Sequence, residues 1–419
     1  MLNRGIAVLA FLTLASPAMA GEGGDILRAN LYAGTLDAGL AALQPKAAAG
    51  DQEARFGVGV LDFFSSIEHF SQALYHYGLA APETETGTGL TLSVPIPANP
   101  HPEHLDYAGV RVVIGRLVDD MDKAKAALVS AGASGDYAVM LEPAKFRIDI
   151  NGDGKGDDSE TVGGILSREF GGEAGQVPSS DAATPTAGSG MEMSFGFDRA
   201  DAIWLAGYSQ VFAAQGDFFL AHDFSELVNA TFHRLFPHAG LPMQDYATNG
   251  QLMFDPQTDR DLVDGIALLH TINWPVIDPD RLKRVRERLK AIIALSRQNW
   301  DAIEAETDDN NEFIPSPKQT THVPGGAVTT EMVAAWRSSL DTADQILDGK
   351  LLIPHWRFKQ GFDLKAYFDT ASRTDLVMIL TGYGALPFLR DGPVATADSF
   401  AAANKAFGDN LPGYAFWFN

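Results

Sequence analysis

The chain has 419 residues, of which 46% are apolar, and it carries a formal net charge of −23 with no cysteine. This apolar content is ample for a buried core, and the length predicts two or three domains or one large helical body. The negative charge argues against nucleic acid or an anionic membrane as a partner, and the lack of cysteine excludes disulfides and thiol chemistry.

The first twenty residues have the pattern of a secretory signal peptide. Arg4 forms a short basic region, residues 6–14 form an apolar core, and Ala18-Met19-Ala20 matches a small-x-small cleavage site. The apolar run is too short to span a bilayer, and no later segment offers about 18 uninterrupted apolar residues. We therefore expect a periplasmic or secreted bacterial protein without a transmembrane segment, with residues 1–20 removed after export.

Residues 21–170 are predicted to form an amino-terminal helical region. Apolar residues recur there at intervals of three and four, which is the spacing of a helix with one buried face. Successive helices of this kind are typical of helical hairpins. The expected elements are helices over residues 25–43, 51–77 and 104–129, a proline-rich loop over 81–102 and a strand over 146–150.

The stretch from Asp149 to Glu160 places oxygen-bearing side chains at the spacing with which one loop wraps a hard cation. Loop positions 1, 3 and 5 carry acidic or amide side chains, Gly154 supplies the turn at position 6, and a glutamate stands at position 12. This pattern resembles an EF-hand calcium loop. The resemblance implies calcium ligands from Asp149, Asn151, Asp153, the backbone carbonyl of Lys155, Asp157 and Glu160.

The flanks of this loop differ from those of a paired sensor EF-hand. Gly156 stands where the family usually has a large aliphatic residue that pairs two loops, and the entering segment reads as a strand rather than a helix. We therefore expect a solitary structural loop with a calcium affinity in the weak range, roughly 10⁻⁴ to 10⁻³ M. The alternative interpretation is a polar surface turn that imitates the pattern.

A segment over residues 171–197 is rich in Gly, Ala, Ser, Thr and Pro, and it is expected to be a flexible linker or insertion. Residues 198–419 are predicted to form a second helical region, whose longest helix has Asp280 as its expected N-cap. The sequence thus predicts a mainly α fold of helical hairpins or a bundle packed in two halves, with a small strand-plus-calcium-loop element. The expected helices of this second region cover residues 198–215, 218–236, 260–272, 280–303 and 330–348, with short ones near 365, 377 and 402.

Four polar residues, His222, Glu226, Asn229 and His233, follow one another at offsets of 0, 4, 7 and 11. On one continuous helix they would share a face. Such a stripe suits a transition metal or an acid–base pair, and the alternative is a polar face within a hydrogen-bond network. As a catalytic set, His222, Glu226 and His233 would make the protein a metal-dependent periplasmic hydrolase.

A second polar stripe runs along the predicted helix over residues 51–77. It either faces the first stripe across a shared cavity or forms the solvated side of an amphipathic helix. The basic run from Arg281 to Lys290 likewise has more than one interpretation: a solvated face, a site for an anionic ligand, or a face that meets an acidic patch of the same chain. The second stripe consists of Asp62, Ser65 or Ser66, His69, Gln72 and His76.

The sequence contains no nucleophile elbow, no phosphate-binding loop and no dinucleotide fingerprint preceded by a strand. Enzymatic activity is therefore left open, and a binding role is favoured. We expect an exported calcium-binding helical protein that acts as a binding or scaffold module in the bacterial envelope, with calcium as a structural ion. Its partner would be an unidentified protein or small molecule, and the hydrolase is the alternative.

Overall fold

The computed structural model describes residues 21–79, 96–164, 194–241, 260–309, 311–320 and 326–407, together with Ala415 and Phe418. The predicted signal peptide lies outside these residues, as do most of the proline-rich loop and residues 171–193 of the predicted linker. The described part of the chain is mainly α-helical, as predicted.

The described residues from 21 to 132 form four α-helices. The single helix expected over residues 25–43 is two helices, because Gly34 adopts a left-handed backbone conformation (φ 65°) that ends the first of them. The next helix begins at Gln52, where Asp51 is the N-cap and accepts a hydrogen bond from the Ala54 amide at 3.0 Å. The four helices are α1 (Glu22–Ala33), α2 (Leu36–Ala48), α3 (Gln52–His76) and α4 (Tyr107–Gly132).

The carboxyl-terminal region follows the predicted order of helices, with one break. The helix expected over residues 218–236 is interrupted, because the backbone at His222 and Asp223 pairs with Pro275 and Val276 instead of continuing the helix. The helices are α6 (Arg199–Leu220), α7 (Ser225–Thr231), α8 (Arg260–Thr271), α9 (Pro279–Ala305), α10 (Thr330–Leu347), α11 (Leu364–Thr370), α12 (Leu376–Thr381) and α13 (Ala401–Phe407).

Within the described ranges, the strands are short and form three two-stranded antiparallel sheets. The strand predicted over residues 146–150 is not formed as such, because this segment makes an isolated bridge between Arg147 and Thr161. The pairs are β1 (Val139–Leu141) with β2 (Phe195–Phe197), β3 (Asn273–Pro275) with β5 (Arg373–Asp375), and β4 (Gly361–Phe362) with β6 (Leu389–Arg390). Strand β2 occupies the end of the segment that was predicted as a linker.

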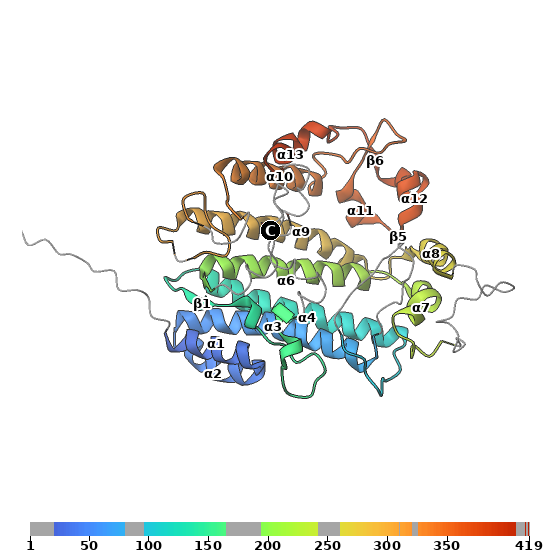
Figure 1. Cartoon of the computed structure of the whole chain (residues 1–419). Helices are drawn as coiled ribbons and strands as arrows, with labels where there is room; N and C mark the ends of the chain where they lie inside the picture. Colours follow the sequence, from blue (N-terminus) through green and yellow to red (C-terminus); the bar gives the residue numbers. More distant parts are fainter. Residues whose placement is uncertain are drawn as a thin grey trace, which may run out of the picture.

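Helices α3, α4, α6 and α9 lie side by side as successive layers, with α1 and α2 on one side and α10 and α13 on the other (Figure 1). The α4 and α6 backbones approach closely at Gly216, where an added Cβ would lie 2.4 Å from the Val118 side chain. One hydrophobic cluster contains residues from both sides of residues 171–197, from Leu27 to Phe418. Among the described helices, none has the length and apolarity that a membrane span requires.

The basic run on α9 meets acidic residues of the same chain, which was one of its three interpretations. Asp217 of α6 is fully buried and accepts hydrogen bonds from Arg281 and, at 2.7 Å, from Arg288. Arg288 also binds both carboxylate oxygens of Asp122 on α4, at 2.6 and 2.7 Å. This network ties α4, α6 and α9 together through fixed guanidinium geometry.

The Phe418 side chain is fully buried against α9 and α10. Its ring centroid lies 4.7 Å from that of Trp300 and 5.9 Å from that of Trp336. The Trp300 indole also donates a hydrogen bond to the Phe418 carbonyl oxygen at 3.3 Å. A residue from the far carboxyl-terminal part of the chain therefore closes the core between these two helices.

Candidate functional site

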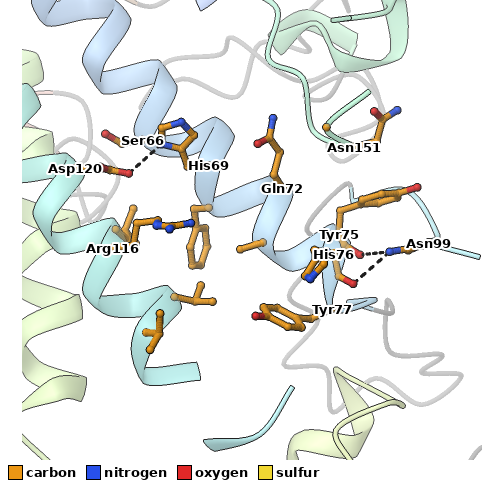
Figure 2. Close-up of a pocket in the computed structure, with 16 residues that line it drawn as sticks. Ser66, His69, Gln72, Tyr75, His76, Tyr77, Asn99, Arg116, Asp120 and Asn151 are labelled. Atoms are coloured by element: carbon orange, nitrogen blue, oxygen red, sulfur yellow. Dashed lines mark hydrogen bonds and ion pairs between the residues drawn. The ribbon is translucent and has the colours of Figure 1, made fainter. Parts of the chain in front are cut away.

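A cavity of about 530 Å³ lies between the carboxyl-terminal half of α3 and the amino-terminal half of α4 (Figure 2). Its α3 wall is the second polar stripe of the sequence, with Ser66, His69, Gln72 and His76 among the lining residues. The first member of the stripe, Asp62, lies outside the cavity and pairs with Lys123 at 2.8 Å. We refer to this cavity as the α3–α4 pocket.

The α4 wall combines apolar residues with two charged side chains that lie one helical turn apart, Arg116 and Asp120. Asp120 is hydrogen-bonded to Nδ1 of His69 on the facing helix, at 3.0 Å, and Figure 2 shows the imidazole turned toward this carboxylate. Sequence reasoning missed both α4 residues. Their i, i+4 spacing was the available signal, since it places them on one face of a helix.

The mouth of the pocket is held by the segment that precedes α4. The side-chain amide of Asn99 donates hydrogen bonds to the carbonyl oxygens of Tyr75 at 3.0 Å and His76 at 3.3 Å, which cap the end of α3. His76 also lies 3.2 Å from the Glu103 carboxylate. These contacts fix the chain around the opening while leaving the cavity itself clear.

The calcium-like loop forms another edge of the same pocket, because Asn151 and Gly152 are among its lining residues. Two α3 side chains hold the start of the loop. Gln72 donates from Nε2 to the Asp149 carbonyl oxygen at 2.8 Å, and Glu68 accepts a hydrogen bond from the Asp149 amide at 2.8 Å. Burial, with a further contribution from the nearby Asp149 charge, raises the pKa of Glu68 to about 7.

The Asp149 carboxylate organises the turn of the loop. Its Oδ1 accepts hydrogen bonds from the amides of Gly152 at 2.8 Å and Asp153 at 3.1 Å, and its Oδ2 accepts one from Gly154 at 2.8 Å. Both glycines adopt positive φ angles, 73° and 84°, which side chains other than glycine rarely adopt. The sequence prediction of a sharp turn at Gly154 is therefore confirmed.

The end of the loop returns to its beginning through Glu160. The Glu160 carboxylate is buried and accepts hydrogen bonds from the amides of Ile150 at 3.0 Å and Asp157 at 2.9 Å. Burial raises the pKa of Glu160, whereas the hydroxyl of Ser159, hydrogen-bonded to Asp157, lowers the pKa of that aspartate. The last three residues of the loop, Asp158–Glu160, form a 3₁₀ turn with Asp157 as its N-cap.

The donor set of the loop fits a hard cation in chemistry, since the carboxylates and amide of Asp149, Asn151, Asp153 and Glu160 supply oxygen alone. Asn151 and Asp153 are folded back on the loop, and each accepts an amide hydrogen bond from the residue two positions later, at 2.8 and 2.9 Å. Across the described ranges, no three His, Cys, Asp or Glu side chains are gathered as a set of metal ligands.

The histidine stripe expected at residues 222–233 does not lie on one helix. His222 follows the end of α6 and is fully buried, with Nδ1 2.6 Å from the Phe218 carbonyl oxygen and Nε2 2.7 Å from the Thr374 hydroxyl. Glu226 is exposed on α7, and His233 belongs to the following 3₁₀ turn. The expectation of a continuous stripe is wrong, because the bridge to Val276 breaks the helix.

The α3–α4 pocket is not a cavity shared by the two polar stripes. The residues that line the α3–α4 pocket include members of the α3 stripe and none of the 222–233 set. A second cavity of about 330 Å³ is almost wholly apolar and lies among aromatic side chains such as Phe63, Trp204 and Phe313. Of these two cavities, the α3–α4 pocket is the one that combines polar, charged and apolar groups.

No protein-family model matches this chain, and comparisons with curated proteins and with solved structures give no match either. The functional argument accordingly depends on the chemistry of the α3–α4 pocket and of the loop at its edge.

Proposed function

We propose that the protein is an exported binding protein of the bacterial envelope, in which the loop over residues 149–160 binds calcium as a structural ion and the α3–α4 pocket holds a small-molecule ligand. The observation that carries this proposal is the junction of loop and pocket. Asn151 and Gly152 line the pocket, and Gln72 connects the pocket wall to the first loop residue.

Support for calcium comes from the donor pattern and from the preformed turn. The loop places Asp149, Asn151, Asp153 and Glu160 at the positions of an EF-hand loop, and Gly154, at position 6, has a positive φ angle of 84° that suits the sharp turn. A structural role is favoured because residues 146–150, which lead into the loop, are not helical, whereas a sensor EF-hand loop joins two helices that move on binding.

Support for ligand binding comes from the size and lining of the pocket. Small-molecule sites usually enclose about 300–1,000 Å³ and combine apolar walls with a few polar groups. The α3–α4 pocket, at about 530 Å³, has both features: apolar residues such as Phe70 and Leu117, and polar ones such as His69 and Arg116. The export part of the proposal is supported by the signal-peptide pattern of residues 1–20.

The test of the calcium site is thermal unfolding in 2 mM calcium and in excess EDTA. An affinity in the weak extracellular range would give about 0.6–1.8 kcal/mol of stabilisation at this concentration, which corresponds to a rise in Tm of about 1–2 °C for a chain of this length. Asp149→Ala combined with Asp153→Ala should abolish the difference between calcium and EDTA. Asp158→Asn, in the same loop but outside the implied ligand set, is the control and should retain it. A melting curve that chelation leaves unchanged contradicts the calcium proposal.

A further inference from the structure

Arg116 is the feature of the α3–α4 pocket that the proposed function does not yet use. Its guanidinium group has no hydrogen-bond or ion-pair partner among the residues that the structure describes. The arginines of α9 are different, since Arg281, Arg286 and Arg288 are all paired with aspartates. In a chain with 54 acidic and 31 basic side chains, a cation left without a carboxylate in a pocket is available for a ligand.

The pairing of Asp120 explains why Arg116 stays unpaired. Arg116 and Asp120 have the i, i+4 spacing at which opposite charges on a helix usually pair. Here the Asp120 carboxylate is directed across the pocket to His69, at 3.0 Å. Figure 2 shows Arg116 extending from α4 into the space between the two helices. The guanidinium group therefore presents its hydrogen-bond donors to the cavity.

The apolar part of the pocket lining indicates that the ligand also has an apolar body. Phe70 and Ala73 of α3 face Val112, Val113 and Leu117 of α4 across the cavity. The Val112 side chain remains 66% exposed, so a large apolar surface at the pocket edge is in contact with solvent. A ligand with an apolar body would cover this surface, at a gain of roughly 25 cal/mol per Å² buried.

We propose that the α3–α4 pocket binds a small organic carboxylate, with the carboxylate on the Arg116 guanidinium and the apolar body against Phe70, Val113 and Leu117. A guanidinium fork matches a carboxylate with two parallel hydrogen bonds. Asp120, on the same wall, disfavours a second negative charge and so favours a monoanion over phosphate. This inference rests on the proposed binding function of the pocket, and it does not require calcium in the loop.

The test uses three probes that share one phenylpropyl body and differ in the terminal group: 3-phenylpropionate, 3-phenylpropanamide and 3-phenylpropylamine. Isothermal titration calorimetry of the purified protein at pH 7.5 should show the carboxylate binding at least ten-fold more tightly than the neutral amide, and no binding of the amine. Inorganic phosphate should fail to compete with the carboxylate. Equal affinity for the carboxylate and the amide, or no carboxylate binding at 10 mM, overturns the proposal.

Arg116→Gln should weaken binding of the carboxylate at least ten-fold while leaving the melting temperature unchanged, because the guanidinium has no described partner to lose. Lys359→Gln is the matched control, since Lys359 is an exposed cation outside the pocket that also lacks a described partner, and it should bind like the parent protein. Unchanged affinity in Arg116→Gln overturns the proposal.

The same titration in EDTA separates this inference from the calcium proposal. If the carboxylate binds but the melting temperature does not respond to calcium, the ligand proposal is supported and only the calcium proposal is contradicted. A calcium-dependent melting temperature without carboxylate binding supports the loop and overturns the ligand assignment.

Discussion

Gln72 donates its side-chain amide to the carbonyl oxygen of Asp149 at 2.8 Å, so a single α3 residue both lines the pocket and fixes the first residue of the loop. Calcium binding in the loop and ligand binding in the pocket can therefore both affect this one hydrogen bond. We predict that calcium and a pocket ligand are coupled through this bond, and any effect of calcium on ligand affinity is then matched by an equal effect of the ligand on calcium affinity.

Gln72→Ala tests this connection. Calcium should raise the affinity of the parent protein for 3-phenylpropionate by about five-fold, the equivalent of one hydrogen bond of about 1 kcal/mol. In Gln72→Ala this dependence on calcium should disappear. Gln345→Ala is the control, because Gln345 is exposed on α10 and bonds within its own helix. Calorimetric titration with and without calcium measures the effect, and an undiminished dependence on calcium in Gln72→Ala would show that the hydrogen bond carries no coupling.

Arg288→Ala should be among the most destabilising single substitutions of the described core. It leaves the fully buried Asp217 with one guanidinium fewer and removes both hydrogen bonds from Asp122. Loss of one partner from a buried ion pair costs about 3–5 kcal/mol. Arg284→Ala is the comparison, since its side chain is 46% exposed and lies 3.7 Å from Asp217. Urea-induced unfolding should show that Arg284→Ala changes the free energy of unfolding by less than about 0.5 kcal/mol. Similar changes in the two variants would contradict the stabilising role of the Arg288 network.

Glu306, directly after α9, should make stability fall as the pH rises. Its carboxyl group is hydrogen-bonded to that of Asp198, the N-cap of α6, and to Gln319 at 3.0 Å. Burial, together with the charge of Asp198, raises the pKa of Glu306 to about 9, from 4.5. The folded state holds this proton more tightly than the unfolded state, so the free energy of unfolding decreases between about pH 4.5 and 9.

Glu306→Gln should flatten that part of the pH profile, because glutamine keeps the shape and cannot lose a proton. The measurement is urea-induced unfolding at pH 5.5, 7 and 8.5. Glu287→Gln, at an exposed position of the same helix, should keep the slope of the parent protein. If the free energy of unfolding of Glu306→Gln still decreases with pH as in the parent protein, the pH dependence belongs to other groups.

His222 should produce the opposite trend in the acid range. Burial lowers the pKa of His222, so the folded state favours the neutral imidazole that bridges Phe218 and Thr374. The unfolded state then binds more protons, and stability is lost as the pH falls below about 6.5. His222→Gln should reduce this loss, at a cost of about 1–3 kcal/mol at neutral pH for buried partners left unpaired. His270→Gln, at an exposed position, is the control.

The same His222 variant distinguishes a structural histidine from a metal ligand. Elemental analysis of the parent protein and of His222→Gln should show equal transition-metal content. Stoichiometric zinc, iron or manganese that disappears in the variant would favour the hydrolase alternative and contradict the bridging role.

The long helices could be predicted because their signals are local. Apolar spacing placed the helices at residues 51–77, 280–303 and 330–348 to within a few residues of α3, α9 and α10. Their exact starts depend on the cap: α9 begins at Pro279 with Asp278, rather than Asp280, as the N-cap. Asp278 and Asp280 are both suitable N-cap residues, and the choice between them depends on tertiary contacts that a local sequence pattern does not contain.

The candidate site could likewise be predicted only in part. The polar stripe of α3 was visible in the sequence, because four of its members that line the pocket recur at helical spacing. The spacing of Arg116 and Asp120 places them on one face of α4, but their position opposite the α3 stripe depends on how the two helices pack, which a local pattern does not contain. The prediction of one helical stripe containing His222 was wrong for a related reason. A bridge to Val276, some fifty positions later in the chain, interrupts the helix that the pattern required.

The burial of Phe418 between Trp300 and Trp336 has a consequence for biogenesis. Until position 418 has been synthesised, Trp300 and Trp336 lack this cover, so the α9–α10 layer cannot take its final packing. During that interval both indoles are available to a chaperone that binds exposed aromatic side chains.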